Sequence, residues 1–568
     1  MIDELTPIVD DVFCELRAAA KRLHRAETAL FDSAAPLLRL HTPLATGADQ
    51  LAARSARESA YEVRALLPFA PGDYQTDFQE GDERKEFERE LAATDQIFAL
   101  PGGRTNEDGA YVLVGKAVVA AADILVAIWD GLEGNGPGGT AHVVDLALDN
   151  AVPVIHIKVD RDNQEAGRPR LLVGGNALEL QAKPLESPQD FDDLLRDTLA
   201  PHTAHERVHI IDYFDEVKRR NNWRIEYSVL LAALRVKAMP RSVWKESPLD
   251  LPAPASPAAA SADGLAPTCP SITAAYEWAN VLAIRYAQLF RSGHVANYVL
   301  SALAVILALF GLIVPSIKVF LVIAELATIG LLFLNTNAGT SGEWHRRWLQ
   351  YRQLAESLRP LPYLKCSGLI STPFRSDFVH GSSHREAGAD WTRWYAAAIW
   401  REMDNPTGVV TATEVGALVD DFVREQVVPQ AQYHRVNAER MYKLDHRLHE
   451  IGNFLTGAVI AVCVLFLVGY VLTPHGVKSL TAPFIFLTAG LPAVGAAVFG
   501  LRGHGEHLLA ASRSANTAVA LEATAARLGH ASELEALARD FEHAAAIMLA
   551  DLNEWTIAYR ERSLEIPA

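Results

Sequence analysis

The sequence predicts an α/β domain with a parallel, doubly wound sheet, followed by an all-α membrane domain of two helical hairpins. Two observations predict this division. Up to about residue 160, short apolar runs alternate with segments of helical spacing, a pattern typical of a parallel sheet covered by helices. Beyond residue 297, four apolar runs of about 17–20 residues are long enough to cross a bilayer as helices.

The N-terminal part begins with helical spacing and then alternates. Helices are expected at 4–31, 48–60, 83–94, 111–122 and 140–151. Strands are expected in the short apolar runs between and after these helices, at 37–44, 63–69, 97–102, 124–130 and 152–157. In sheets of this kind, ligands bind at the carboxyl ends of the strands. The loops at those ends are therefore the first place to look for a site.

Three glycine-bearing loops follow predicted strands at that edge. They read ATGAD (45–49), PGGRTNEDG (101–109) and GNGPGGTA (134–141). Glycine lets backbone N–H groups approach a phosphate closely, and the N-terminus of a following helix favours an anion. Each loop is alternatively a tight turn with an N-cap, and Thr140 either caps its helix or donates to a phosphate oxygen. Three such loops at one edge favour a phosphate site.

Four apolar runs are the expected membrane spans, at 298–314, 319–335, 454–472 and 482–501. The alternative is a large buried core of a soluble protein. Short connections at 315–318 and 473–481 join the runs into two hairpins. Glu325 is the one charged residue within them. It either lines a pore or marks a gating contact, or it is protonated or hydrogen-bonded between packed helices.

The distribution of charge predicts the orientation. The hairpin tips carry only Lys318 and Lys478, so the positive-inside rule places the remaining soluble segments in the cytoplasm. The formal net charge of −17 argues against non-specific binding to nucleic acid. The four cysteines are far apart, and no metal site is expected. The basic residues that flank the spans on the soluble side are Arg285, Arg291, Arg346, Arg347, Arg352, Lys443, Arg447 and Arg502.

Composition divides the chain into five parts. They are the α/β domain at 1–160, a helical extension at 161–245, a flexible linker rich in Pro, Ala and Ser at 246–270, a first membrane part at 271–430 with its hairpin at 298–335, and a second at 431–568 with its hairpin at 454–501. At one spacing Tyr286 aligns with Tyr442, and Asn297 with Asn453. The identity is weak, so the sequence leaves open whether the hairpins are copies of each other.

Four motifs in the N-terminal part carry a resemblance to a known family. TPLATGADQLAARSA, ALLPFAPGDYQTDF, AYVLVGKAVVAAADILVAIWDG and GPGGTAHVVDLALDNAVPVIHI, within residues 10–158, resemble the SLOG superfamily. This Rossmann-like group includes phosphoribohydrolases and nucleotide sensors of bacterial conflict systems. The resemblance implies a nucleotide-binding domain whose ligand contacts Gly47, Ala48, Asp49, Pro68, Phe69, Gly102, Gly103, Tyr111, Trp129, Asp130, Gly138, Gly139 and Thr140.

The sequence departs from the SLOG pattern at its start. Domains of this sub-group begin with a strand that ends in a Gly-His-Arg turn, whereas this sequence begins at the following helix. Either its start is placed late or the domain is shortened, and a missing first strand is expected to leave the centre of the sheet open.

A second resemblance concerns the membrane part. AAYEWANVLAIRYAQLFRSGHVANYVLSALAVILALFG and WHRRWLQYRQLAESLR resemble the SLATT class of two-transmembrane effector domains. The resemblance implies an effector that responds to a nucleotide second messenger. It also implies that the effector permeabilises the bacterial inner membrane during phage infection.

The loop GNGPGGTA raises the question of catalysis. The related phosphoribohydrolases carry a P-G-G-x-G-T-x-x-E loop, whose glutamate acts on the N-glycosidic bond. PGGTAHVVD (137–145) has one residue fewer before Thr140, and its acid, Asp145, lies on a helix expected to turn it away from the loop. Asp49 and Asp130, at strand ends, either bind ribose hydroxyls or cap turns. Without a suitable carboxylate pair, no catalytic residue is assigned.

The sequence therefore predicts a membrane effector rather than an enzyme. Its cytoplasmic domain is expected to sense a cyclic nucleotide or an ADP-ribose-type signal, without a further cofactor. Its hairpins are expected to contact the lipid bilayer, homo-oligomerise and permeabilise the inner membrane in antiphage defence. One alternative is a membrane-anchored nucleotide N-glycosidase, or phosphoribohydrolase, in which the spans only tether. Another is a constitutive channel or transporter with a vestigial α/β domain.

Overall fold

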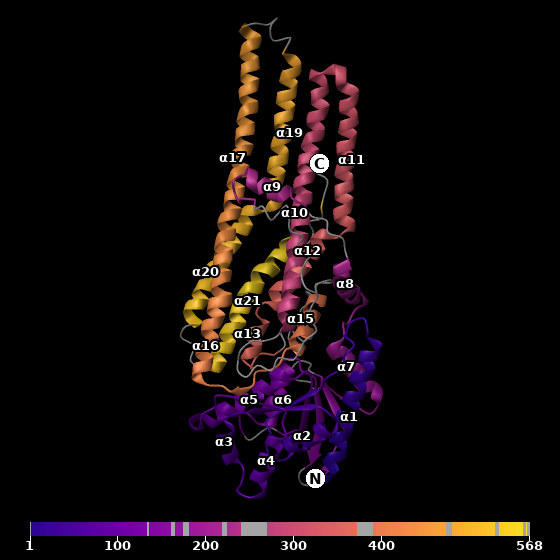
Figure 1. The fold of residues 1–568 in the computed structure, drawn as a ribbon, viewed down its shortest axis with the longest axis vertical. Helices are drawn as coiled ribbons and strands as arrows, with labels where there is room; N and C mark the ends of the chain where they lie inside the picture. The colour runs from indigo at the N-terminus through magenta and orange to yellow at the C-terminus, as the bar shows by residue number, and fades with distance from the viewer. Residues whose placement is uncertain are drawn as a thin grey trace.

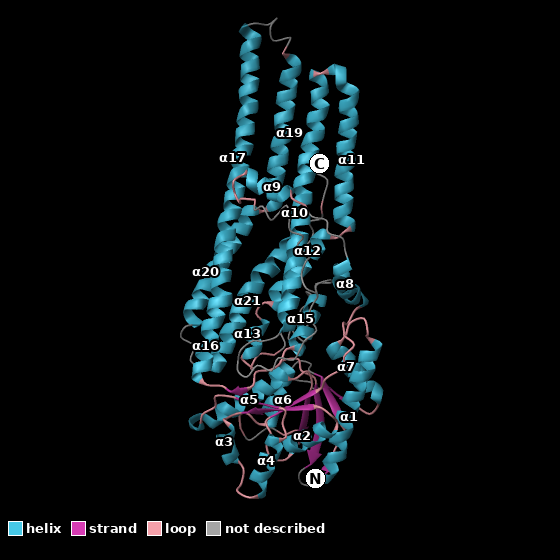
Figure 2. Cartoon of the chain, viewed as in Figure 1, coloured by secondary structure: helices cyan, strands magenta, loops and turns pink. Residues whose placement is uncertain are grey.

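The structure, a computed structural model, describes residues 2–132, 136–160, 165–173, 181–218, 224–239, 270–371, 390–472, 480–528, 533–559 and Leu564. The molecule is elongated, with an α/β region at one end and four long helices at the other (Figure 1, Figure 2). Further helices lie between the two ends and connect them. The predicted order, an N-terminal α/β part followed by a helical part with four long apolar helices, is confirmed.

The strands and helices predicted for the first 160 residues are present, with ends shifted by a few residues. The strands are β1 (Arg39–Thr42), β2 (Glu62–Leu67), β3 (Gln96–Ala99), β4 (Leu125–Trp129) and β5 (Val154–Asp160). The helices are α1 (Ile2–Ala26), α2 (Ala48–Glu58), α3 (Pro71–Tyr74), α4 (Asp82–Ala92), α5 (Glu107–Ala121) and α6 (Thr140–Asp149). β2 is buried at five consecutive residues because helices cover both of its faces. Four of these five residues are apolar, and the fifth is the buried Arg64.

The parallel strands form two separate sheets instead of one. β1, β2 and β3 pair in parallel in the first sheet, and β4 pairs in parallel with β5 in the second. Among the described residues, no ladder joins β1 to β4. The doubly wound sheet is therefore open at its centre, as the sequence analysis expected of a domain without its first strand. Leu16 of α1 and Val118 of α5 both face this opening.

The expectation of a purely helical extension at 161–245 is wrong in its first part. β6 (Glu165–Ala166) and β7 (Arg170–Val173) pair antiparallel with β5, and β8 (Gln181–Pro184) pairs with β7. Strands of two to four residues are too short to show the alternation by which a strand is recognised. The helices that follow are α7 (Pro188–Leu199), α8 (Ala204–Phe214), the 3-10 helix η3 (Asp215–Lys218) and α9 (Glu226–Ala233).

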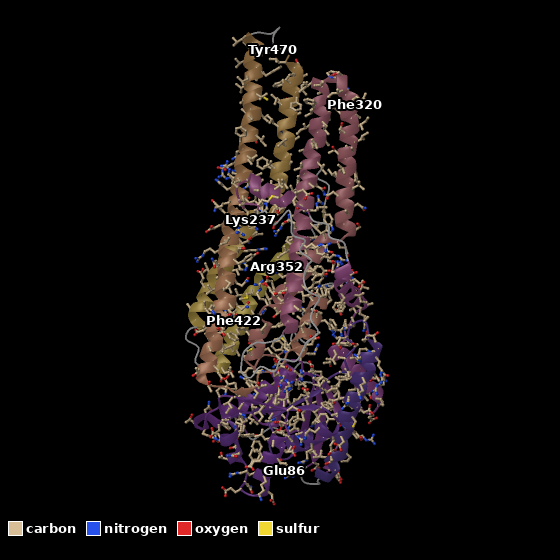
Figure 3. The ribbon with its side chains drawn as sticks, in the orientation of Figure 1. Glu86, Lys237, Phe320, Arg352, Phe422 and Tyr470 are labelled. Carbon is tan, nitrogen blue, oxygen red and sulfur yellow. The ribbon has the colours of Figure 1, made fainter. Side chains whose placement is uncertain are left out.

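The helical part carries the four apolar runs on long helices. They are α10 (Pro270–Ile313), α11 (Lys318–Ser341), α17 (Val428–Leu472) and α19 (Thr481–Gly505), and each belongs to a segment long and apolar enough to cross a membrane. Phe320 is 73% exposed and Phe454 is 75% exposed. In Figure 3, Phe320 and Tyr470 lie at the end of the molecule far from Glu86. Apolar surface exposed on this scale indicates a membrane protein.

The two hairpins share one plan. A helix of 44 or 45 residues is followed by one of 24 or 25 residues. A third helix then packs back on the first, α12 (Trp344–Leu358) on α10 and α20 (His507–Leu528) on α17. In both hairpins a glutamate with left-handed backbone, Glu343 or Glu506, makes the turn before the third helix. Because this conformation is uncommon outside glycine, its recurrence favours an internal duplication.

Shorter elements complete the helical part and join it to the α/β region. They are α13 (Leu361–Cys366), α15 (Asp390–Glu402), β9 (Gly408–Val409), α16 (Ala412–Phe422), the π-helix η6 (Val423–Val427) and α21 (Leu534–Tyr559). β9 pairs in parallel with β3, so backbone hydrogen bonds connect the two parts. The boundary expected between 430 and 431 falls inside α17, near its start. The linker expected at 246–270 lies outside the described residues apart from Pro270.

Candidate functional site

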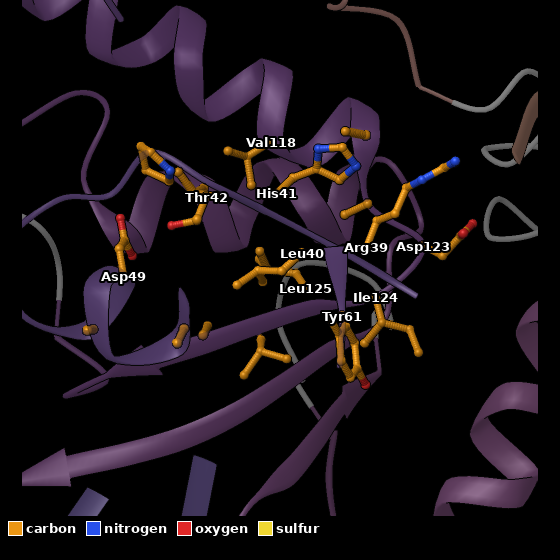
Figure 4. A pocket seen from close by; sticks show the side chains of 18 of the residues that line it. Arg39, Leu40, His41, Thr42, Asp49, Tyr61, Val118, Asp123, Ile124 and Leu125 are labelled. Carbon is orange, nitrogen blue, oxygen red and sulfur yellow. The ribbon is translucent and has the colours of Figure 1, made fainter. Parts of the chain in front are cut away.

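A cavity of about 1000 Å³ occupies the opening between β1 and β4 (Figure 4). We call the end near Asp49 the outer end and the end near Asp123 the inner end. The loops after β1 and β4 and the starts of α2 and α6 form the outer end, where the strands finish. The predicted ligand residues that line the cavity are Gly47, Ala48, Asp49, Tyr111, Gly138, Gly139 and Thr140.

The other predicted residues do not line this cavity, and several lie behind it. The ring of Phe69 packs edge-on against Tyr111, with centroids 5.8 Å apart, and the Arg104 guanidinium lies 4.1 Å from the Phe69 centroid. A Cβ on Gly102 would lie 2.1 Å from the carbonyl oxygen of Pro68, so these loops touch. Phe69 therefore positions Tyr111. The predicted residues outside the lining are Pro68, Phe69, Gly102, Gly103, Trp129 and Asp130.

Trp129 and Asp130 shape the turn after β4. The Trp129 indole N–H donates to the carbonyl of Leu132 at 2.9 Å, and the Leu132 N–H donates to the Asp130 carboxylate at 3.1 Å. This is the turn-capping role that the sequence left open for Asp130. Asp145 is exposed on α6 and does not line the cavity. The expectation that its helix turns it away from the loop is consistent with this position.

Gly138 requires glycine on two counts. Its φ of +86° is in the left-handed region, and a Cβ there would lie 2.7 Å from the Cβ of Tyr111. The residue at the N-cap of α6 is Gly139, and Thr140 is the first residue of the helix. Thr140 thus does not cap the helix, and its place on the cavity wall leaves the role of phosphate donor open to it. The start of α6 beside a glycine loop suits a phosphate.

Asp49 is the carboxylate at the outer end. Its Oδ2 accepts a hydrogen bond from the N–H of Ala45 at 3.2 Å. Burial raises the pKa of Asp49 to about 6, although the Ala45 N–H opposes this shift. The carboxylate is therefore ionised at neutral pH at a cost in stability, and it is ready to accept hydrogen bonds from hydroxyl groups of a ligand.

Asp49→Asn is expected to stabilise the protein at neutral pH but not in acid. The pKa of the Asp49 carboxyl is about 6 in the folded state, against an ordinary value of 3.8 in the unfolded chain. Ionisation of Asp49 therefore destabilises the folded state, fully above pH 6 and not at all below pH 3.8. Two pKa units correspond to at most about 3 kcal/mol. Thermal unfolding of the full chain in detergent across pH measures the gain. Asp145→Asn is the control, and the same pH dependence in both variants would contradict the assignment.

Residues that the sequence analysis did not select form the inner end. Figure 4 shows Asp49 and Asp123 at opposite ends of the cavity, with Arg39 beside Asp123. No sequence motif pointed to the residues that the helical part contributes to this end. His41 was the one available signal, because it is a polar residue within the apolar strand predicted at 37–44. Those that line the inner end are Arg39, His41 and Asp123 of the α/β region, and Lys365, Trp400, Arg401, Met403 and Asn405 of the helical part.

The carboxylates around the inner end are held by arginines. Asp123 pairs with Arg401 at 2.8 Å. Asp404 pairs with both Arg39 and Arg64, each at 3.1 Å. These pairs join β1, β2 and the start of β4 to the segment around α15. The helical part therefore closes the inner end of the cavity, and a ligand there contacts both parts of the molecule.

A buried carboxylate joins the α/β region to the first hairpin. Glu216 of η3 is completely buried and accepts hydrogen bonds from Tyr286 of α10 at 2.9 Å and from Tyr351 of α12 at 2.8 Å. It also pairs with Arg347 of α12, whose second nitrogen donates to Asp212 at 3.1 Å. One side chain thus ties the segment after the sheets to two helices of the hairpin. The network holds these elements in a fixed arrangement.

Glu325 lies at a helix interface. It lines a second cavity, of about 410 Å³, together with Ser301, Ala304 and Ala308 of α10. The expected roles in a pore, in gating or in helix packing all require a position of this kind, because a carboxylate at membrane depth avoids lipid. The small neighbours leave space beside it.

The chain matches no protein-family model, no curated protein and no solved structure at a significant level. The resemblances to the SLOG and SLATT families therefore stay predictions.

Proposed function

We propose that the chain is a membrane effector. Its cytoplasmic α/β region senses a nucleotide-derived messenger, either a cyclic nucleotide or an ADP-ribose-type molecule. Its hairpins, assembled in a homo-oligomer, permeabilise the bacterial inner membrane as part of antiphage defence. The supporting observation is the cavity. Two of the three predicted glycine loops, 45–49 and 134–141, and the start of α6 contribute residues to its outer end, and the helical part forms the wall of its inner end.

A cavity shared by two parts of a molecule is suited to sensing. A ligand that contacts both parts favours the arrangement in which both contacts are made, and this shifts the population of the whole molecule. The change can reach the membrane helices along two routes. One is α12 and α13, which follow α11 in the chain, and the other is the Glu216 network on α10 and α12.

Permeabilisation requires several copies of the chain. Four spans enclose little space, and the exposed apolar faces of α11 and α17 are free to contact either lipid or another copy.

A nucleotide hydrolase is the rival function. Cleavage of an N-glycosidic bond needs a positioned carboxylate and a tuned partner. In the described part of the chain, the carboxylates that line the cavity are Asp49 and Asp123, at opposite ends. This separation favours sensing. Incubation with nucleoside monophosphates tests the rival, because turnover that Asp49→Asn or Asp145→Ala abolishes would establish a hydrolase.

The full chain in dye-loaded liposomes is expected to release the dye only with a stabilising nucleotide. A ligand at about a hundred times its Kd adds about 2.7 kcal/mol to the stability of the folded state. Thermal unfolding against cyclic nucleotides and ADP-ribose identifies the nucleotide, and fluorescence of the released dye measures permeation. If no nucleotide raises the melting temperature, sensing is refuted. Release without any nucleotide would instead indicate a constitutive channel.

A further inference from the structure

Lys365 of α13 is a buried amine that forms no ion pair among the described residues, and burial lowers its pKa to about 7. Its side chain lines the inner end of the cavity and is only 8% exposed. Its Nζ lies 4.6 Å from the ring centroid of Trp400. Among the described residues, this amine makes no hydrogen bond or ion pair, and the nearby Asp123 and Asp404 are already held by arginines. Burying an ammonium in this way is costly unless an anion joins it.

His41 offers a second unused donor beside the same cavity. Its Nε2 is 3.1 Å from the amide nitrogen of Asn405, which is a donor. Burial, reinforced by Arg64, lowers the pKa of His41 to about 3, so the ring is neutral. Because Nε2 accepts from Asn405, the ring proton is assigned to Nδ1. Nδ1 is buried and has no partner among the described residues.

The space between the two ends of the cavity is apolar. Leu40, Val118, Ile124 and Val126 line it. The four residues of β1 run from the inner to the outer end, and at a rise of about 3.3 Å per residue their Cα atoms span roughly 10 Å. An occupant that reaches both ends must therefore be long, with an apolar or aromatic middle.

We propose that Lys365 and His41 form an anion site for a phosphate or carboxylate group, and that the ligand of this cavity is an elongated molecule with an anionic group at each end. The second statement rests on the proposed function, which supplies the phosphate at the outer end. The inner group pairs with Lys365 and accepts the Nδ1 proton of His41. Since α13 belongs to the helical part, this contact is how the ligand reaches the membrane helices. A shorter ligand with one anion occupies the outer end alone.

Protection of Lys365 from acylation tests the anion site. The full chain in nanodiscs is treated with an amine-reactive reagent, and mass spectrometry measures modification of Lys365 and of the exposed Lys183. Alkane diphosphonates of increasing chain length are expected to protect Lys365 about tenfold once they span the cavity, but not Lys183. Alkane monophosphonates are expected to protect it weakly. If no phosphonate or phosphate protects Lys365, the anion site is refuted.

Substitution of Lys365 tests the two-ended ligand. Lys365→Met is expected to weaken diphosphonate binding about tenfold and to leave monophosphonate binding unchanged, because it removes one charged contact. Lys183→Met is the matched control. If inorganic phosphate protects Lys365 as well as the diphosphonates do, the site takes a free ion and the elongated ligand is refuted. Protection without a nucleotide response would refute only the proposed function, whereas a nucleotide response that Lys365→Met leaves intact would refute only this inference.

Discussion

Glu216→Gln is expected to reduce the free energy of unfolding by roughly 2–3 kcal/mol. The substitution removes the buried one of the carboxylates that pair with Arg347 and leaves it Asp212, while Tyr286 and Tyr351 keep an acceptor. Arg347 is only 3% exposed, so it would stay buried with a weaker partner. The same change loosens the tie between η3 and the helices α10 and α12. Nucleotide-triggered dye release is therefore expected to fall even under conditions where the variant is folded.

Glu522→Gln is the matched control for this prediction. Glu522 pairs with Arg435 between α20 and α17, but their side chains are 44% and 63% exposed. An exposed pair of this kind contributes at most about 1 kcal/mol. Denaturant unfolding of the full chain in detergent compares the two variants. Equal losses in stability would mean that the Glu216 network does not hold the two parts together.

Gly138→Val is expected to abolish stabilisation by the nucleotide. A β-branched residue at φ +86° is strained by about 1–3 kcal/mol. Its Cβ also meets the Cβ of Tyr111 at 2.7 Å, so the loop and Tyr111 must move apart. This displaces the start of α6, where the phosphate is proposed to bind. Thermal unfolding with and without the nucleotide measures the loss, and the melting temperature without it shows whether the variant folds.

Gly136→Val controls for a change in the same loop. No heavy atom lies within 4 Å of a Cβ built on Gly136, and its φ is outside the left-handed region. This variant is expected to bind the nucleotide as the wild type does. A folded Gly138→Val protein with wild-type affinity would show that the loop does not form the phosphate site.

The sequence by itself determined the local elements and the membrane character. Strands such as 124–130 and helices such as 140–151 were predicted because apolar spacing and glycine turns act over a few residues. The long apolar helices followed from length and composition, since a span needs about 20 apolar residues. At the outer end, Gly47, Asp49 and Gly138 could be named because the carboxyl ends of parallel strands share an edge.

Only the tertiary structure decided the rest, and the reason is the distance along the chain between the groups involved. β9 has two residues and exists because β3 pairs with it, so no local pattern marks it. The inner end brings His41 of β1 to Lys365 of α13, and the Glu216 network joins η3 to α10 and α12. Such contacts depend on how whole elements pack, which periodicity does not encode. The sequence located the rim of the cavity, and packing placed the membrane-linked helices at its other end.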